Sequence, residues 1–337
     1  MKTLNTLIIS FIFLFTFSSS ELFAFSQEVK QEKIALIKEL KRKGEIVYAI
    51  IPKNSAEPFY QPVAKGCKDR AKELGVNCIY YGSSPANMRL QVNDILDLID
   101  AGVDGISVAA VRKDYINSVI KKEIKEWAKA FISFDSPLNS DISMSYIGTN
   151  NYLLGKSLGE EIRKLKPNGG NYCIQTERHD SPNHNDRVHG IVDGLTNSGL
   201  DSSKWKVVPR CPQKTMGDFE VSLKQMEVVL KFYEVDVFAS TGGGPQFLPE
   251  QYREVIAPFK DKIESGELIF ANIDTMPFQL EYLKEGISTV NVGQRPYDMG
   301  KMSIETLIKL SNGEKVPEII YTGLTYCTKD TADTCTK

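Results

Sequence analysis

Residues 46–51, IVYAII, form a short run of apolar residues with no charged or strongly polar interruption. A strand with one face in water alternates apolar and polar residues, whereas a strand buried on both faces of a parallel sheet is apolar throughout. A helical pattern follows at 60–74 and ends at Gly75, a residue suited to the left-handed conformation that closes helices. A second apolar stretch follows at 76–81. The order strand, helix, strand predicts a right-handed crossover between two parallel strands.

The same alternation continues along most of the chain. Further strands are predicted, with helices between most of them, at 106–111, 131–134, 146–148, 171–175, 205–209, 235–239, 268–273 and 288–292. These strands are too many for one open sheet of ordinary size, and the pattern restarts after a break at 135–145. We therefore predict an α/β protein with two doubly wound parallel-sheet lobes, the second of which begins with the strand at 146–148.

The N-terminus has the layout of an export signal. Lys2 precedes an apolar run at 7–17, and Ala24 follows a short serine stretch and is suited to cleavage. The run is too short to span a bilayer comfortably. We predict a signal peptide at 1–24, followed by an amphipathic extension at 25–44; the alternative is an uncleaved N-terminal anchor.

The composition excludes several classes of protein. The 337 residues include 41 Lys and Arg against 43 Asp and Glu, so the formal net charge of −2 gives no general electrostatic basis for binding nucleic acid. We find no dinucleotide fingerprint, no nucleophile elbow and no Cys or His pair with the spacing of zinc ligands. We therefore expect no cofactor, no metal ion and no catalytic site.

Six cysteines, all after the predicted cleavage site, suggest disulfide bonds formed in an oxidising compartment. Six cysteines allow 15 full pairings, so the exact pairing stays open. The candidate pairs are Cys67–Cys78, which would tie a helix to the next strand, Cys327–Cys335, which would staple the tail at 327–335, and Cys173–Cys211, which would need two separate strands to be neighbours. The alternative is that the buried cysteines are free and pack as small apolar side chains.

In doubly wound sheets, ligands bind beyond the carboxyl ends of the strands. Here those positions carry carboxylates, a guanidinium, an amide and two aromatic rings, in the segments 52–60, 135–137, 185–190, 240–245, 274 and 294–296. Each hydroxyl of a sugar both donates and accepts hydrogen bonds, so charged planar groups can bind it from two sides. The apolar face of a sugar ring packs well on an aromatic ring. The pattern therefore indicates a polyhydroxylated ligand.

Structural explanations compete with this interpretation. Phe59 and Tyr60 could pack in the core, although adjacent residues rarely share one environment, so at least one ring is expected in the cleft. Asp135 could be a helix cap or a hinge anchor, and Asp274 could cap the helix that follows it. Arg187 could form a solvated ion pair at a helix start, but the helix dipole disfavours a cation there, which favours a binding role.

Two further motifs lie beside these residues. The histidines His179, His184 and His189 are spaced five residues apart, which does not place them on one helix face; we expect them to line or flank the pocket loop, in roles that stay open. The glycines at 242–244 lack the Lys-Ser/Thr ending of a phosphate-binding loop, so we expect them to let the backbone approach a ligand or relax a tight turn.

Taken in order, these motifs resemble the periplasmic sugar-binding proteins of the ribose/galactose-binding type, which are solute receptors of ABC importers. The resemblance covers about residues 45–325 and rests on the segments Pro58-Phe59-Tyr60, Phe134-Asp135, Arg187-x-x-Gly190, Ile273-Asp274 and Gln294-x-Pro296. It implies the type I periplasmic binding protein fold, in which a multi-strand hinge joins the lobes. The implied first lobe is 45–145 plus about 295–318, and the second is 146–294 plus the C-terminal segment.

The resemblance also implies a ligand-binding role for nine residues. Carried over position by position, they are Lys53, Glu57, Phe59, Tyr60, Asp135, Arg187, Thr241, Asp274 and Gln294. Thr241 stands where the family often has Asn, Glu57 replaces another common Asn, and the glycines at 242–244 are a departure from the family pattern. These differences leave the identity of the sugar open.

The function implied is that of a monomeric receptor, exported to the periplasm, which closes on a small carbohydrate or polyol and delivers it to a membrane permease of an ABC importer. One alternative is a sensing receptor for a furanosyl signal molecule or an osmolyte, partnered with a sensor kinase or chemoreceptor. Another is a secreted enzyme. No DNA-binding helix-turn-helix precedes the first lobe, which argues against the related sugar-responsive repressors.

Overall fold

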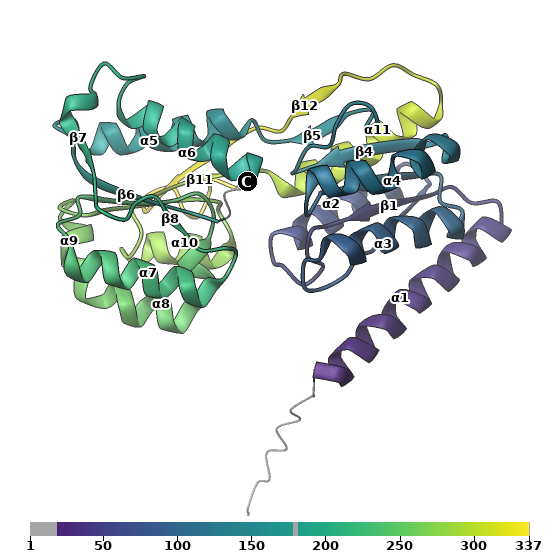
Figure 1. Ribbon diagram of the computed structural model, residues 1–337, viewed down its shortest axis with the longest axis horizontal. Coiled ribbons are helices and arrows are strands. Elements are labelled where there is room, and N and C mark those ends of the chain that lie inside the picture. Colours follow the sequence, from purple (N-terminus) through teal and green to yellow (C-terminus); the bar gives the residue numbers. More distant parts are fainter. Residues whose placement is uncertain (1–18, 178–180, 337) are drawn as a thin grey trace, which may run out of the picture.

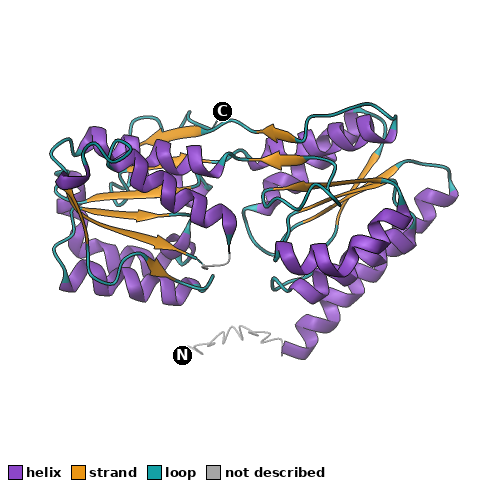
Figure 2. Ribbon diagram, turned by 45° about the horizontal axis from the view of Figure 1, so that its top comes forward, coloured by secondary structure: helices purple, strands orange, loops and turns teal. Residues whose placement is uncertain are grey.

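The computed structural model describes residues 19–177 and 181–336 and has two lobes, each built on one sheet with helices on both faces (Figures 1 and 2). These are the two α/β lobes that the sequence predicted. Most of the predicted signal peptide at 1–24 lies outside the described residues. Within them, no helix is long and apolar enough to cross a membrane.

The first lobe has six parallel strands in the order β12-β5-β4-β3-β1-β2. They are β1 (Val47–Ile51), β2 (Asn77–Tyr80), β3 (Gly105–Val108), β4 (Ala130–Phe134), β5 (Tyr146–Gly148) and β12 (Ile319–Tyr321). One face of this sheet packs on α3 (Met88–Ala101) and α4 (Lys113–Trp127), and the other on α2 (Tyr60–Glu73) and α11 (Pro296–Ser311).

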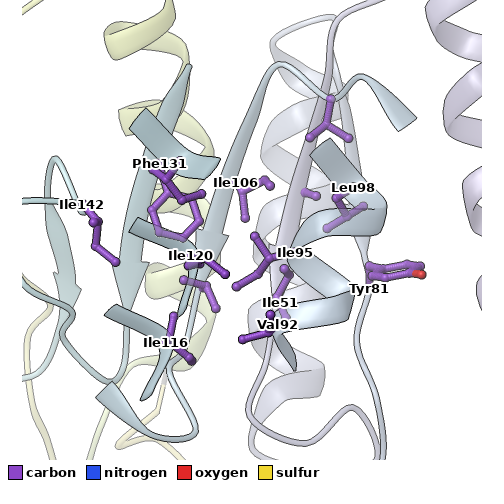
Figure 3. Packing of buried hydrophobic residues seen from close by; sticks show 14 of the residues in the cluster. Ile51, Tyr81, Val92, Ile95, Leu98, Ile106, Ile116, Ile120, Phe131 and Ile142 are labelled. Atoms are coloured by element: carbon purple, nitrogen blue, oxygen red, sulfur yellow. The ribbon is translucent and has the colours of Figure 1, made fainter. Parts of the chain in front are cut away.

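The run that opened the sequence argument forms β1, an inner strand that lies between β3 and the edge strand β2. Every residue of β1 is buried, as a strand covered on both faces requires. Ile51 packs with Val92 and Ile95 of α3 on one face, while Ile116 and Ile120 of α4 extend the same cluster (Figure 3). The carboxyl end of β1 is thereby fixed, and with it the loop that carries the first predicted binding residues.

The second lobe has the strand order β13-β11-β10-β9-β6-β7, with β8 also paired to β6. Its strands are β6 (Gly170–Thr176), β7 (Trp205–Val207), β8 (Gln213–Lys214), β9 (Val237–Ser240), β10 (Ile269–Ile273), β11 (Val290–Gly293) and β13 (Thr325–Thr328). All pairs are parallel except that of β11 with β13. The last strand therefore enters this sheet in the opposite direction.

Helices of the second lobe also lie on both faces of its sheet. On one face are α5 (Asn151–Leu165) and α6 (Pro182–Leu195), and on the other are α7 (Phe219–Phe232) and α8 (Pro249–Ile256). The remaining helices are α9 (Lys260–Glu264), α10 (Pro277–Lys284) and the short 3₁₀ turns Ser202–Lys204, Gly244–Phe247 and Ala257–Phe259.

The described chain passes between the lobes three times, at 149–150, 294–295 and 322–324. The strand at 146–148 was expected to begin the second lobe, but β5 pairs with β4 and β12 in the first sheet. The change of lobe thus falls after β5 and not at 135–145. The sequence also gave no sign of β12 or β13.

The extension expected at 25–44 belongs to α1 (Ser19–Arg42), a helix that runs diagonally along the first lobe (Figure 1). Its contact with the lobe is partly polar. Lys30 forms a buried ion pair with Asp94, and its ammonium group donates to Ser83 Oγ at 3.3 Å. Ile37 is fully buried in the core cluster. The helix is therefore an integral part of this lobe.

The three cysteine pairs suggested by the sequence are disulfide-bonded: Cys67–Cys78, Cys173–Cys211 and Cys327–Cys335. The first joins α2 to β2, and the second joins β6 to the segment that leads into β8. The third closes the tail, where Cys327 packs with Leu283 of α10 and with Ala332.

Candidate functional site

One hollow between the lobes is lined by eight of the nine residues that the sequence selected. They are Lys53, Glu57, Phe59, Tyr60, Asp135, Arg187, Asp274 and Gln294. The first five come from the carboxyl ends of β1 and β4, and Arg187 and Asp274 come from the second lobe. Gln294 lies on one of the chain crossings between the lobes. Residues from both sheets therefore share one space, as the strand-end rule predicts.

Thr241 does not line this hollow and lies behind its wall. Its carbonyl oxygen accepts from Arg187 Nη1 at 2.9 Å, and its hydroxyl lies 2.8 Å from His184 Nδ1. Its side chain is almost fully buried. In this arrangement Thr241 holds two residues of the wall in place.

Asp135 is the centre of the polar group from the first lobe. Lys53 Nζ and the Tyr60 hydroxyl both contact its Oδ2, at 2.9 and 3.0 Å. Burial opposes ionisation of Asp135, but Lys53 and then Arg187 outweigh it and hold the pKa of this carboxyl below its usual value. Asp135 is therefore a carboxylate with fixed donors, ready to accept from a ligand hydroxyl.

Arg187 projects from α6 and is 2% exposed. Besides the bond to Thr241, its Nε donates to Asn151 Oδ1 at 2.9 Å, at the start of α5. The two helices touch closely, because a Cβ at Gly155 would lie 2.1 Å from the Arg187 carbonyl oxygen. Only glycine permits this approach, which sets the position of the guanidinium relative to the cleft.

Asp274 and Gln294 connect the ligand space to the hinge. Gln294 Nε2 donates to Asp274 Oδ1 at 2.8 Å, and Gln294 Oε1 accepts from the Thr149 hydroxyl at 3.0 Å. Thr149 and Gln294 lie on two different chain crossings. Burial raises the pKa of Asp274, although Arg187 and the Gln294 amide favour its charged form.

The two aspartates share an unusual backbone. Asp135 follows β4 with a φ of 53°, and Asp274 follows β10 with a φ of 82°. Left-handed conformations cost a residue with a Cβ on the order of 1 kcal/mol, although Asp tolerates them better than most. In both lobes the chain thus turns sharply at the strand end and directs a carboxylate into the hollow.

Glu57 is an acid of the site with a strongly raised pKa. Burial first, and then repulsion by Glu177 of the opposite lobe, raise its pKa to about 8, against the opposing effect of Lys53. The Glu57 side chain is half-buried. At neutral pH the empty site therefore holds it largely in the protonated form.

The sequence argument missed three residues of the wall: Glu177, Asn183 and Phe247. Gly242 and Gly243 also line the hollow, which agrees with the expectation that these glycines let the backbone approach a ligand. Among the histidines, His184 lines the hollow, as was expected of this group, His189 is exposed and His179 lies outside the described residues. Burial lowers the pKa of His184 well below its usual value, and the cations Arg187 and Lys53 add to this effect. His184 is therefore neutral.

The arrangement is suited to binding a polar small molecule. It offers hydrogen-bonding groups from both lobes together with the rings of Phe59 and Phe247. A second cavity of about 450 Å³ shares Phe59, Asp274 and Gln294 with it. Among the described residues, no cluster of His, Cys, Asp or Glu side chains is arranged to hold a metal ion.

Comparison with known proteins agrees with this geometry. The family described as "periplasmic binding protein domain" matches residues 48–315. The chain belongs to this family. The match confirms the resemblance inferred from the sequence, and the description of the family agrees with the prediction of a binding protein.

Three relatives illustrate the similarity of this periplasmic binding protein to others. An ABC transporter solute-binding protein from Burkholderia graminis C4D1M, solved with D-arabinose, is 28% identical, with a TM-score of 0.76 over 87% of this chain and 98% of that one. The D-allose-binding periplasmic protein of Escherichia coli (strain K12) is 21% identical over 285 residues, which are 80% of this chain and 86% of the relative. A solute-binding protein from Bacillus halodurans C-125, solved with myo-inositol, shares the fold at 20% identity and a TM-score of 0.73, over 87% and 97% of the chains.

Proposed function

We propose that the protein is a periplasmic solute receptor that binds a small carbohydrate between its lobes, closes on it and delivers it to an ABC importer. The observation that carries the proposal is the shared hollow, in which the first lobe contributes Asp135 and two aromatic rings and the second contributes Arg187 and Asp274. The three relatives described above are named for, or were solved with, polyhydroxylated ligands.

The chemistry of the wall matches hydroxyl groups. Asp135 and Asp274 can accept hydrogen bonds, and Arg187 can donate in the plane of its guanidinium. Phe59 gives a sugar ring an apolar surface on which to lie. Because these groups belong to different lobes, a ligand that contacts all of them favours the closed arrangement over the open one.

Closure can be sensed at the hinge through Gln294, which contacts Asp274 in the cleft and Thr149 on a second crossing. A ligand hydroxyl bound to Asp274 would stabilise this chain of bonds. The closed receptor would then present surfaces of both lobes, in one fixed relation, to the membrane permease.

A thermal-shift screen followed by calorimetry tests the proposal. D-arabinose, D-allose, myo-inositol and other monosaccharides and polyols are screened, because a ligand that binds only the folded state raises the Tm. Calorimetry then compares Arg187→Ala and Asp274→Asn with Glu126→Gln, an exposed carboxylate on α4 far from the cleft. We expect the first two to bind about ten- to a hundredfold more weakly and the third to bind normally. Normal affinity in both cleft variants, or no shift with any sugar or polyol, would contradict the proposal.

A further inference from the structure

The polar hollow adjoins a larger space between the lobes. The hollow has a volume of about 80 Å³, whereas the second cavity has a volume of about 450 Å³. The two spaces share Phe59, Asp274 and Gln294. A ligand that is held by the polar groups of the hollow therefore has room to extend past these three residues.

The second cavity differs from the hollow in its chemistry. Six of the side chains that line it present an apolar or aromatic surface: Phe59, Pro62, Met276, Pro277, Pro296 and Tyr297. They come from both lobes, because the segment at 275–277 follows β10 and the others lie at the starts of α2 and α11. The recognition of sugar hydroxyls does not require such a surface, whereas burial of an apolar group does.

The polar side chains of this cavity interact with one another. Gln294 donates to Asp274 at 2.8 Å, the Thr275 and Thr325 hydroxyls lie 3.4 Å apart, and Arg295 lies 3.8 Å from Asp298. A group that enters the cavity therefore meets polar atoms that already have protein partners. An apolar group leaves these pairs intact, since it offers no hydrogen bond that would replace them.

The apolar wall is held in place without a ligand. The Tyr297 hydroxyl donates to Asp69 Oδ2 at 3.0 Å, and Lys65 Nζ lies 5.5 Å from the centroid of its ring. Met276 belongs to the second lobe but is buried in the apolar cluster of the first lobe, so the lobes are in contact beside the cavity. Phe59 is buried and meets the ring of Tyr60 edge-on, with the ring centroids 5.2 Å apart. A cavity with such walls binds without a large cost in ordering its side chains.

We propose that the natural ligand is a glycoside with an apolar substituent, whose sugar lies in the polar hollow and whose substituent lies in the second cavity. The inference rests on the proposed function and narrows its substrate class. Phe59 would contact both parts of the ligand, because it lines both spaces. The substituent would pack between Met276 and Tyr297, and the flexible methionine side chain can adapt to its shape.

Calorimetry with matched glycosides tests the inference. The probes are the methyl and phenyl glycosides of D-glucose, D-galactose, D-allose and D-arabinose, in both anomeric forms, together with the disaccharides cellobiose and lactose. We expect at least one phenyl glycoside to bind the wild type about tenfold or more tightly than the methyl glycoside of the same sugar and anomer, because burial removes the apolar ring from water. Its binding should also have the more negative change in heat capacity.

Two variants of the cavity wall show whether the cavity causes this preference. Tyr297→Ala removes an aromatic wall, and Pro277→Asp places a carboxylate at the first position of α10, where the helix dipole favours it. Each should lower the ratio of phenyl to methyl glycoside affinity at least about threefold. The matched control is Tyr152→Ala, because Tyr152 is also an exposed tyrosine whose hydroxyl donates to an aspartate, but it lies outside this cavity; it should keep the ratio.

The ratio separates the cavity from the hollow, because both glycosides are measured on the same protein and share one sugar. If no phenyl glycoside binds more tightly than its methyl partner, if both wall variants keep the preference, or if a disaccharide binds as tightly as the best phenyl glycoside, the inference is overturned and the proposed function stands. If no sugar, polyol or glycoside binds, both are overturned.

Discussion

Glu57 should make the folded protein less stable as the pH rises, and Glu57→Gln should remove this effect. In the folded protein the pKa of Glu57 is raised to about 8, by burial and by repulsion from Glu177, from an ordinary value of 4.5. The unfolded chain therefore releases this proton near pH 4.5, whereas the folded chain keeps it up to about pH 8. Stability falls with rising pH between these two values and is level above them.

The size of the effect follows from the same values. A rise of the pKa from 4.5 to about 8 sets a ceiling of about 5 kcal/mol, at about 1.4 kcal/mol per pH unit. The side chain keeps part of its surface in contact with solvent, which screens the repulsion. We therefore expect Glu57→Gln to raise the free energy of unfolding by about 2 kcal/mol at pH 8.5 and by much less at pH 5.

Urea unfolding of the ligand-free protein at several pH values between 5 and 8.5 is the assay. Taking the difference between wild type and Glu57→Gln at each pH cancels groups that titrate in both proteins, such as His184. The exposed Glu126→Gln variant controls for the loss of one carboxylate. Parallel pH profiles of wild type and Glu57→Gln would refute the reasoning, because they would mean that Glu57 ionises normally in the folded state.

Two further variants test contacts that hold the lobes in shape. Lys30→Met leaves Asp94 buried without its cation, so the free energy of unfolding measured in urea should fall by about 3–5 kcal/mol. The double variant Lys30→Met with Asp94→Leu should regain most of this free energy, because it removes the buried charge as well. Equal losses in the single and the double variant would contradict this prediction. Gly155→Ala places a methyl group against the Arg187 carbonyl, so it should lower the free energy of unfolding by about 1–3 kcal/mol and weaken sugar binding. Leu153→Ala, on the exposed side of the same helix, should change neither property. Unchanged stability and affinity in Gly155→Ala would show that the helices can separate freely.

The sequence predicted the two lobes well because inner strands of both sheets are buried on both faces. Every residue of β1 and of β10 is buried. A strand buried on both faces is largely apolar, so it can be recognised from its own residues without knowing its partners. β12 was missed because it has three residues, two of which are exposed, and it is a strand only through its pairing with β5. β5 was assigned to the wrong lobe for the same reason, since its place depends on partners and not on its own three residues.

The prediction of the binding site was limited in the same way: residues that follow long buried strands were found, and residues placed by other parts of the fold were missed. Asp135 and Asp274 follow long buried strands, so the strand-end rule located both. Glu177 was missed because β6 continues through Thr176, one residue beyond its predicted end, and the search was directed to the later segment at 185–190. Phe247 ends a 3₁₀ turn, and its contact with the cleft depends on the path of that turn and not on the end of a strand.

The two strands at the end of the chain have a consequence for biosynthesis. β12 and β13 lie at 319–321 and 325–328, yet one is an edge strand of the first sheet and the other an edge strand of the second. A nascent chain that has not yet reached residue 319 therefore lacks an edge strand of both sheets. Until residues 319–328 have been made, β5 and β11 each keep an open edge, so neither sheet can have its native set of strands.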